Sequence, residues 1–314
     1  MKAILLKQFG GTENLVEEEI AVPAILENEV LVKVRAFSIN PVDVKTRNGE
    51  ALAELLKHED PVILGWDISG VIVDTGKNVT LFKLHDEVFG MVNFTGHGKA
   101  YAEYVAVPAA HVALKPENIS HVAAAATTLA ALTAWQAFTY FGKLNSGDKV
   151  LIHAAAGGVG HFAVQIARHL GAFVVGTSSG KHREFVLGLG ADRHIDYRTE
   201  DFEDELRNID FVLETIGHDT FRRSVRVLRE GGTVVNLPSG LKAEDENAAL
   251  RKKLNACFFM SVFSSGNDMK IIAALLERKI IRPYIYKVYS FTEVREAHLQ
   301  IETGRTKGKV VVEV

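Results

Sequence analysis

Short stretches in which apolar and polar residues alternate fill the first 115 residues of the chain. A two-residue period is typical of strands with one buried face, and turns such as Gly10-Gly11 and Gly49 separate the stretches. Many short strands at this spacing indicate a small β-barrel or sandwich-like domain. The pattern predicts strands at Lys2–Lys7, Leu15–Glu19, Glu29–Ser38, Ser69–Thr75, Glu87–Val92, Ala100–Val107 and Val112–Leu114.

From about Ser120 the pattern changes to strands that alternate with helices. The alanine-rich stretch His121–Phe138 predicts a buried helix. Alternation of strands and helices favours a parallel sheet covered on both faces, the doubly wound arrangement. The predicted strands are Asp148–His153, Phe173–Thr177, Asp210–Thr215, Gly232–Leu237 and Cys257–Phe263, and the predicted helices are Val159–Leu170, Lys181–Leu189, Thr220–Leu228 and Asp268–Arg278.

The β pattern returns after Ile280. Strands are predicted at Pro283–Tyr289 and Lys309–Val314, around a helix at Glu293–Thr303. The most economical interpretation is that the C-terminal end completes the first domain. We therefore expect an α/β protein in which residues 1–119 and 280–314 form a β-rich domain and residues 120–279 form an inserted dinucleotide-type domain.

The composition is that of a globular protein. Of 314 residues, 47% are hydrophobic and 24% are charged, and the formal net charge is -3. This near balance lacks the basic excess that would indicate a nucleic acid or an anionic membrane as a partner. The apolar run Ala3–Leu6 is too short for a signal-peptide core, and threonines interrupt His121–Phe138. We expect a cytoplasmic protein without a membrane span.

The chain has a single cysteine, Cys257, and twelve histidines. One thiol can form no intramolecular disulfide and cannot supply the several thiolates of a structural zinc site. The histidines show no His-Glu-x-x-His pair or comparable metal spacing. We therefore expect no metal site.

The segment 153–160 has the sequence of a dinucleotide-binding turn. It reads HAAAGGVG, follows a predicted strand and precedes a predicted helix. Glycines in such a turn permit a tight bend, close approach of the backbone to a pyrophosphate and close packing of the helix on the strand. Ala155 stands where the first glycine of the full motif falls. An ordinary strand-to-helix turn without a ligand is the alternative interpretation.

The end of the next strand indicates which dinucleotide binds. NAD-binding domains need an acid there for the ribose 2′-hydroxyl. This chain has hydroxyl groups and cations instead, in Ser178-Ser179-Gly180-Lys181-His182-Arg183, and these suit a 2′-phosphate. The same residues could serve only as the N-cap and first turn of a helix. The missing acid favours NADPH over NADH.

These features together carry a family resemblance that spans the chain. They are the domain order, HAAAGGVG at 153–160, Leu189-Gly190-Ala191-Asp192 and the terminal Gly308-Lys309-Val310-Val311. The chain resembles the medium-chain dehydrogenase/reductase superfamily, in particular its zinc-independent quinone oxidoreductase branch. The segment Asn40–Lys45 is similar to the alkenal and enone reductases of that branch. The resemblance implies a GroES-like β-rich catalytic domain with an inserted Rossmann domain that binds NADPH.

The resemblance also implies a set of cofactor-binding residues. Gly157, Gly158 and Val159 would face the pyrophosphate, and Ser178, Lys181 and Tyr197 would surround the 2′-phosphate. Ile216 and Gly217 would line the adenosine ribose, and Thr133 with the backbone around Leu237 and Phe259 would hold the nicotinamide. Tyr197 is also a plausible core aromatic at a strand end.

The chain departs from its zinc-dependent relatives at the ligand positions. Those relatives place a Cys in the segment that here reads Phe37-Ser38-Ile39-Asn40, and Gly-His-Glu where this chain has Gly65-Trp66-Asp67. Without zinc as a Lewis acid, alcohol oxidation is disfavoured. A conjugated carbonyl or a quinone can accept a hydride without metal activation, because the negative charge spreads onto an oxygen that a few donors can stabilise.

Candidate donors lie in Asn40–Lys45. Lys45 can donate to the developing oxyanion, Asn40 can hold that oxyanion or the cofactor, and Asp43 either orients Lys45 or caps the turn. A polar turn closed by Pro41 is the alternative interpretation. Many relatives have a tyrosine proton donor after an Arg-x-Gly element, whereas here Arg47-Asn48-Gly49 is followed by Glu50 and Ala51. We therefore expect solvent to supply the proton.

The leading hypothesis is an NADPH-dependent reductase of quinones or α,β-unsaturated carbonyls. A metal-free carbonyl or alcohol oxidoreductase and a non-catalytic NADPH-binding sensor are the alternatives, since a fold alone does not establish catalysis. Trp66 is expected either to line the substrate pocket or to belong to the core. The apolar stretch Cys257–Phe263, as the last strand of a sheet, would leave an exposed edge, which predicts a homodimer.

Overall fold

The computed structural model describes residues 1–314 and divides the chain into two units. The first, here named the β-rich unit, comprises residues 1–132 and 263–314, and the second, the parallel-sheet unit, comprises residues 133–262. The boundaries that we expected from the sequence lay near residues 119 and 280. Each unit is described by itself.

The β-rich unit is built around one long strand, β3 (Glu29–Ile39), which pairs with three neighbours. Its C-terminal half is buried on both faces, in keeping with the apolar sequence there. A seven-stranded sheet has the order β14-β15-β3-β4-β5-β7, with β6 also paired to β3, and β1 and β2 form a separate antiparallel pair. The other strands are β1 (Lys2–Leu6), β2 (Leu15–Glu19), β4 (Asp67–Thr75), β5 (Glu87–Met91), β6 (Tyr104–Pro108), β7 (Val112–Leu114), β14 (Ile285–Ser290) and β15 (Lys309–Glu313).

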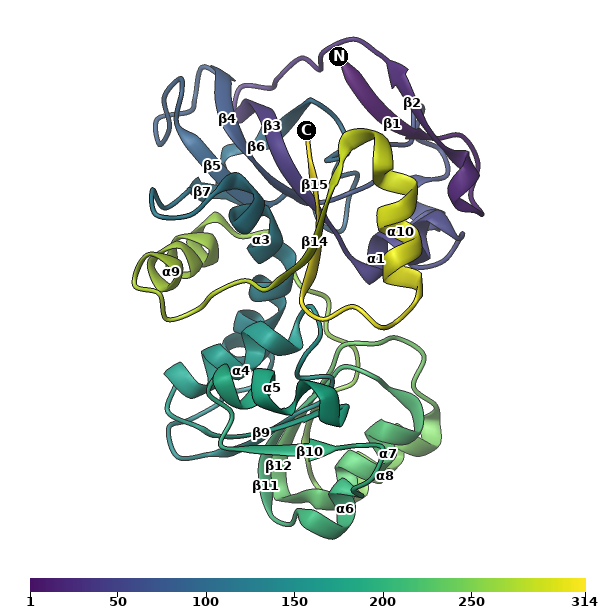
Figure 1. The fold of residues 1–314 in the computed structure, drawn as a ribbon, viewed down its shortest axis with the longest axis vertical. Helices are drawn as coiled ribbons and strands as arrows, with labels where there is room; N and C mark the ends of the chain where they lie inside the picture. The colour runs from purple at the N-terminus through teal and green to yellow at the C-terminus, as the bar shows by residue number, and fades with distance from the viewer. The chain divides into compact units, whose positions relative to one another are not determined.

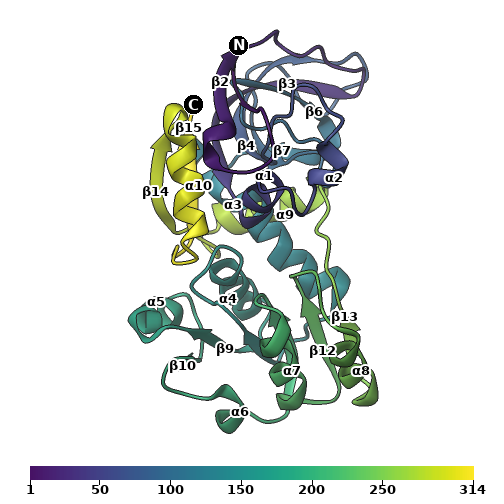
Figure 2. The same ribbon diagram turned by 90° about the vertical axis from the view of Figure 1, so that its right-hand side faces the viewer.

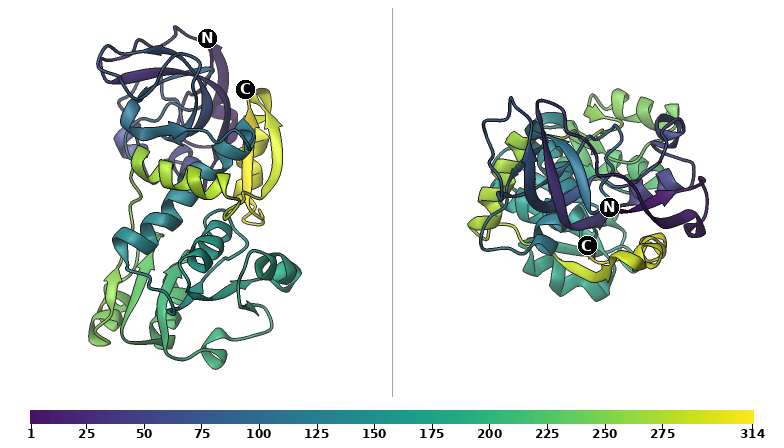
Figure 3. Two further views of the ribbon diagram at one scale, coloured as in Figure 1. Left: turned by 90° about the vertical axis from the view of Figure 1, so that its left-hand side faces the viewer. Right: turned by 90° about the horizontal axis from the view of Figure 1, so that it is seen from above.

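Helices cover parts of this sheet. Helix α10 lies beside β14 and β15 (Figure 1), and α9 packs on β7 (Figure 3, yellow-green in the left view). The start of α3 packs alanines 125 and 126 against Ala36 and Val311, so small residues allow a close helix-to-sheet approach. The helices are α1 (Pro41–Arg47), α2 (Ala53–Leu56), α3 (His121–Gln136), α9 (Gly266–Glu277) and α10 (Val294–Glu302), with 3-10 turns at Thr12–Asn14, Ala109–His111 and Phe291–Glu293.

The parallel-sheet unit has a six-stranded, all-parallel sheet of order β10-β9-β8-β11-β12-β13. The strand order reverses between β8 and β11, and the connecting helices α4 and α5 lie on one face of the sheet and α7 and α8 on the other (Figure 2). The strands are β8 (Lys149–Ile152), β9 (Phe173–Ser178), β10 (Arg193–Asp196), β11 (Ile209–Glu214), β12 (Leu228–Asn236) and β13 (Asn255–Cys257). The helices are α4 (Gly160–His169), α5 (Arg183–Gly188), α6 (Phe202–Glu205), α7 (His218–Val227) and α8 (Ala243–Arg251), with a 3-10 turn at Gly180–His182 and a π-turn at Ala137–Phe141.

Several predicted elements differ from the structure. The strand expected at Cys257–Phe263 occupies only Asn255–Cys257, because the chain then leaves the sheet edge. The strand expected at Ala100–Val107 begins only at Tyr104. Helix α9, which we expected in the inserted domain, belongs to the β-rich unit. The sequence pattern did not predict α1, α2, α6, α8 or β10.

The segment His121–Phe141 is long and apolar enough to cross a membrane by length and composition alone. However, 78% of its most apolar window is buried within the protein. Such burial is typical of a core helix, as the interrupting threonines indicated.

Candidate functional site

The glycine-rich turn lies between β8 and α4, as the sequence indicated. Gly157 N donates to Ala154 O (2.8 Å), and Ala155 N donates to Thr177 O of β9 (2.9 Å), which ties the turn to the neighbouring strand. Gly160 begins α4, and a Cβ there would overlap the Ala154 carbonyl. The turn therefore requires glycine at this place for close packing of the helix on the strand.

Gly176 on β9 explains how Ala155 replaces the first glycine of the motif. Ala155 is fully buried, and a Cβ added to Gly176 would lie 2.8 Å from the Ala155 methyl group. One missing Cβ on β9 thus makes room for the extra Cβ in the turn. The departure from the full motif is accommodated inside the sheet and leaves the path of the turn unchanged.

The predicted 2′-phosphate residues lie at the end of β9, in the turn after it, and directly after β10. Ser178 and Ser179 are buried, whereas Lys181 and Tyr197 are exposed, and Arg198 lies 5.8 Å from the Tyr197 ring centroid. The exposed position of Tyr197 agrees with a surface role and not with a core aromatic.

Two residues near this loop could not be predicted from the local sequence, because they belong to β10. His194 Nε2 lies 2.8 Å from Ser178 Oγ, and His194 is 2% exposed. The pKa of His194 is lowered, chiefly by burial. The Asp196 carboxylate lies directly against Gly180, so a Cβ at Gly180 would overlap it. An acid is therefore present close to the loop, contributed by the adjacent strand and not by β9.

The loop after β11 carries Ile216 and Gly217. Gly217 has φ +85° and is the N-cap of α7, a conformation that favours glycine. The fully buried Glu214 carboxylate accepts hydrogen bonds from Ile216 N (2.7 Å) and Gly217 N (3.0 Å). Glu214, at the end of β11, thereby fixes the backbone of the loop, and the Ile216 side chain is exposed.

The predicted nicotinamide residues lie after β12, beyond β13 and in α3. Leu237 N donates to Glu214 O (2.9 Å), Phe259 is 57% exposed, and Thr133 is buried. Asn236 was not anticipated, although it joins two of these segments. Its Nδ2 donates to Pro238 O (2.6 Å) and to Phe258 O (2.9 Å), while its buried Oδ1 has no hydrogen-bond partner.

In the β-rich unit, Asn40–Lys45 forms the start of helix α1 and not merely a turn. Asn40 is the N-cap, Pro41 occupies the first helical position, and Asp43 Oδ2 accepts from Asn40 N (2.5 Å). Asp43 therefore caps the helix, and no ion pair joins it to Lys45. Lys45 is exposed on α1.

The Asn40 side chain is 2% exposed and is already bonded at both ends. Its Nδ2 donates to Asp67 Oδ2 (2.8 Å), and its Oδ1 accepts from Lys309 Nζ. The structure thus gives this amide a buried partner on each side, where we expected it to hold an oxyanion or the cofactor. Lys309 lies in β15, at the other end of the sequence, and its place beside Asn40 was not predicted.

Asp67 is the centre of this buried polar network. Its carboxylate lies 3.7 Å from Lys309 Nζ and is the acceptor for four donors from three elements. Burial lowers the pKa of Lys309, although the two nearby carboxylates oppose that shift. Burial likewise raises the pKa of Asp43 to about 7. The donors to Asp67 are Ser38 Oγ, Asn40 Nδ2, Thr128 Oγ1 and Leu129 N.

Trp66 belongs to the core. It is fully buried, its Nε1 donates to Gly96 O (2.8 Å), and its ring meets Phe94 edge-on at 5.5 Å between centroids. The alternative of a pocket-lining residue is not favoured by this packing.

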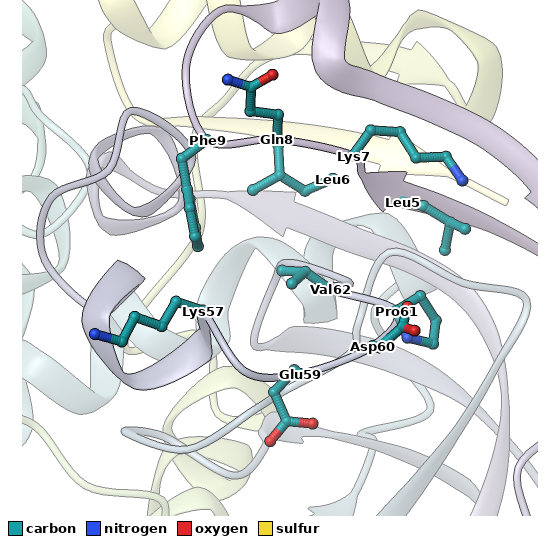
Figure 4. Close-up of a pocket in the computed structure, with 10 residues that line it drawn as sticks. All are labelled: Leu5, Leu6, Lys7, Gln8, Phe9, Lys57, Glu59, Asp60, Pro61 and Val62. Carbon is teal, nitrogen blue, oxygen red and sulfur yellow. The ribbon is translucent and has the colours of Figure 1, made fainter.

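A surface hollow of about 300 Å³ lies in the β-rich unit but contains none of the candidate residues (Figure 4). It lies between the segment Leu5–Phe9 and the loop Lys57–Val62. Of its four charged side chains, Lys7 pairs with Glu18 at 2.5 Å, Glu59 lies 3.0 Å from His97, and Lys57 pairs with Glu54. We assign it no role in the reaction.

Comparison with known proteins identifies the class that this fold and these residues define. A family described as "Alcohol dehydrogenase GroES-like domain" matches residues 26–117, and one described as "Zinc-binding dehydrogenase" matches residues 189–312. The chain is 36% identical to a 2-methylene-furan-3-one reductase of Solanum lycopersicum, over 99% of this chain and 79% of that protein. It is 34% identical to an NADPH-dependent alkenal/one oxidoreductase of Arabidopsis thaliana, with the same coverage.

A solved quinone oxidoreductase from Coxiella burnetii superposes with a TM-score of 0.94, at 35% identity, over 100% of this chain and 99% of that one. The chain belongs to the medium-chain dehydrogenase/reductase superfamily, in its quinone oxidoreductase branch. The GroES-like and Rossmann-type folds expected from the sequence are confirmed.

One family description mentions zinc, and the residues of this chain do not suit it. Protein zinc sites use cysteine, histidine and carboxylate ligands. Here the Asp67 carboxylate is surrounded by hydroxyl, amide and ammonium donors, and no group of three or more His, Cys, Asp or Glu could hold a metal ion.

Proposed function

We propose that this protein is an oxidoreductase that uses NADPH to reduce quinones or α,β-unsaturated carbonyls, that is, enals and enones. The carrying observation is the loop after β9, which has buried hydroxyls and exposed cations and no acid of its own where NAD-binding domains place one, the nearby Asp196 belonging to the adjacent strand. Relatives named for enone and alkenal reduction, aligned over 99% of the chain, support this assignment.

The parallel-sheet unit has residues that fit this cofactor. The turn at Gly157, Gly158 and Val159 presents backbone N–H groups at the start of α4, which suits a pyrophosphate. Ser178, Lys181 and Tyr197 suit a 2′-phosphate. Ile216 and Gly217 are assigned to the adenosine ribose, and Thr133, Leu237 and Phe259 to the nicotinamide.

When bound, NADPH supplies a hydride for the β-carbon of the acceptor. The chain's part is to stabilise the negative charge that then develops on the acceptor oxygen. We assign this to the exposed Lys45 ammonium. Asn40 and Asp43, which are buried, hold the first turn of α1 and so orient Lys45. Solvent supplies the proton that completes the reduction.

The proposal is tested by following NADPH and NADH oxidation with a panel of acceptors. Quinones, enals and enones should be reduced faster with NADPH than with NADH, and saturated aldehydes should react poorly. Absence of turnover with every quinone, enal and enone would overturn the proposal. Faster reduction of saturated aldehydes would point to a carbonyl reductase, and tight NADPH binding without turnover would point to a sensor.

The role of Lys45 is tested with two matched lysine variants. Lys45→Ala should lower kcat for an enone by about a hundredfold or more, the usual cost of losing one oxyanion donor. Lys77→Ala is the control, because Lys77 is far from Lys45 along the sheet. It lies in the turn at the opposite end of β3, where Gly76 N donates to Glu29 O. Equal activity of both variants would show that Lys45 takes no part.

Two features of the wider setting belong to the same proposal. We assign the protein to the cytoplasm, although the Arabidopsis relative is named as chloroplastic. We also assign it a homodimeric state, because β13 is the last strand of its sheet and has no outer neighbour.

A further inference from the structure

Four polar side chains are buried together at the carboxyl ends of β8, β9 and β11. His153 follows β8, Thr177 is in β9 beside Ser178, Glu214 ends β11, and Ser224 is in α7. All four are 2% exposed or less. Burying polar groups raises the free energy of the folded state unless each group finds a hydrogen-bond partner.

The four side chains form one continuous chain of hydrogen bonds with His153 in the middle. His153 Nδ1 lies 3.0 Å from Thr177 Oγ1, and His153 Nε2 lies 2.9 Å from Ser224 Oγ. Ser224 Oγ in turn lies 3.1 Å from Glu214 Oε2. The other Glu214 oxygen accepts from the amides of Ile216 and Gly217.

The three loops that follow these strands carry most of the residues assigned to the cofactor. His153 directly precedes the turn with Gly157–Val159, Thr177 directly precedes Ser178, and Glu214 holds Ile216 and Gly217. A further bond, Thr215 Oγ1 to His153 O at 2.9 Å, joins the first and third loops through the backbone. The His153 side chain therefore contacts the second loop through Thr177 and is linked to the third through Ser224 and Glu214.

The donors can be assigned from chemistry. A carboxylate accepts only, so the bond between Ser224 and Glu214 is donated by the Ser224 hydroxyl, and the Ser224 oxygen accepts from His153 Nε2–H. Thr220 O, at 2.8 Å from Ser224 Oγ, is a second acceptor for the same hydroxyl proton. Nδ1 then accepts from the Thr177 hydroxyl. This describes a neutral imidazole with its proton on Nε2. Burial lowers the pKa of His153 and favours the neutral form, against the opposing charge of Glu214.

We propose that His153 is a positioning residue for the dinucleotide: its neutral Nε2–H imidazole sets the relative places of the three cofactor loops. The proposal rests on the proposed NADPH-dependent function. It concerns only the parallel-sheet unit, and it gives a role to the first residue of the HAAAGGVG segment.

Three variants separate positioning from simple support of the fold. His153→Leu keeps the volume and removes both hydrogen bonds. His153→Gln retains one donor and one acceptor. Val234→Ala is the control, because Val234 is a fully buried residue of β12 whose truncation weakens the same unit without touching the chain of hydrogen bonds.

NADPH affinity and the thermal midpoint are measured for each variant. His153→Leu should weaken NADPH binding by about tenfold, the scale expected for buried groups left without partners, and His153→Gln should recover most of that loss. Val234→Ala should lower the midpoint but change affinity less than about twofold. Equal affinity losses in His153→Leu and Val234→Ala, or none in either, would overturn the positioning role.

Wild-type protein gives an independent readout that does not depend on a variant folding. In 15N-histidine NMR, His153 should be the Nε2–H tautomer throughout pH 6–8, and its resonances should shift when NADPH is added. An Nδ1–H tautomer or an imidazolium would contradict the proposal. If the wild-type protein fails to bind NADPH at all, the proposed function fails, and this is distinguished from a failure confined to His153 variants.

Discussion

At the scale of single residues, Asp43 is the acid whose pKa is shifted most by its surroundings. It is fully buried, and its pKa is raised to about 7, mainly because burial removes water from the carboxylate and partly because Asp67 is near. Hydrogen bonds from Asn40 N and from the Tyr101 hydroxyl oppose this shift of the pKa. A buried carboxylate of this kind is tolerated best when protonated, so the folded state holds a proton that the unfolded chain releases.

This proton makes stability depend on pH. The folded pKa lies above the unfolded value of 3.8, so the stabilising contribution is complete below about pH 4 and is lost as pH rises toward 7. Asp43→Asn removes the ionisation. Its free energy of unfolding, relative to wild type, should therefore increase between pH 5 and pH 8 in urea titrations. A difference that stays constant over this range would show that Asp43 is ionised in the folded protein throughout.

Site residues that belong to a motif of adjacent residues could be predicted from the sequence. Site residues that are brought together by contacts between distant parts of the chain could not. The turn at 153–160 needs only a strand, glycines and a helix start, all adjacent in sequence. Lys309 contacts Asn40 across 269 positions, and His194 reaches Ser178 from another strand. No spacing rule connects such pairs, so the buried network around Asp67 was absent from the sequence interpretation.

At the scale of elements, periodicity gave the type of most helices and strands but not the core to which each belongs. Helix α9 has a clear amphipathic pattern, yet that pattern does not say that it packs on β7 of the β-rich unit. The stretch after Cys257 is apolar and therefore resembled a strand. Asn236 Nδ2 instead holds Phe258 O, and the chain turns away from the sheet after three paired residues.

The short strand β13 still forms an exposed sheet edge, and this leads to a prediction about assembly. An unpaired edge is stabilised when a second copy covers it. Light scattering at micromolar concentration should give a mass of about twice 34.5 kDa. A single-chain mass at that concentration would contradict the dimer, and the proposed chemistry would be unaffected.

At the scale of the whole molecule, the two units divide the work that the proposal requires. The parallel-sheet unit offers loops at the point where the strand order reverses, the usual place for a dinucleotide. The β-rich unit offers an exposed lysine on a helix whose first turn is fixed by a buried polar network. The family could be predicted from sequence because its motifs span both units.

The central claim is that hydride reaches the β-carbon of a conjugated acceptor. The most direct test uses NADPH carrying deuterium at C4 on the transferred face, with a simple enone as acceptor. The product analysed by NMR should be the saturated ketone with deuterium at the β-carbon and a solvent-derived proton at the α-carbon. An allylic alcohol with deuterium on the carbonyl carbon would contradict the account.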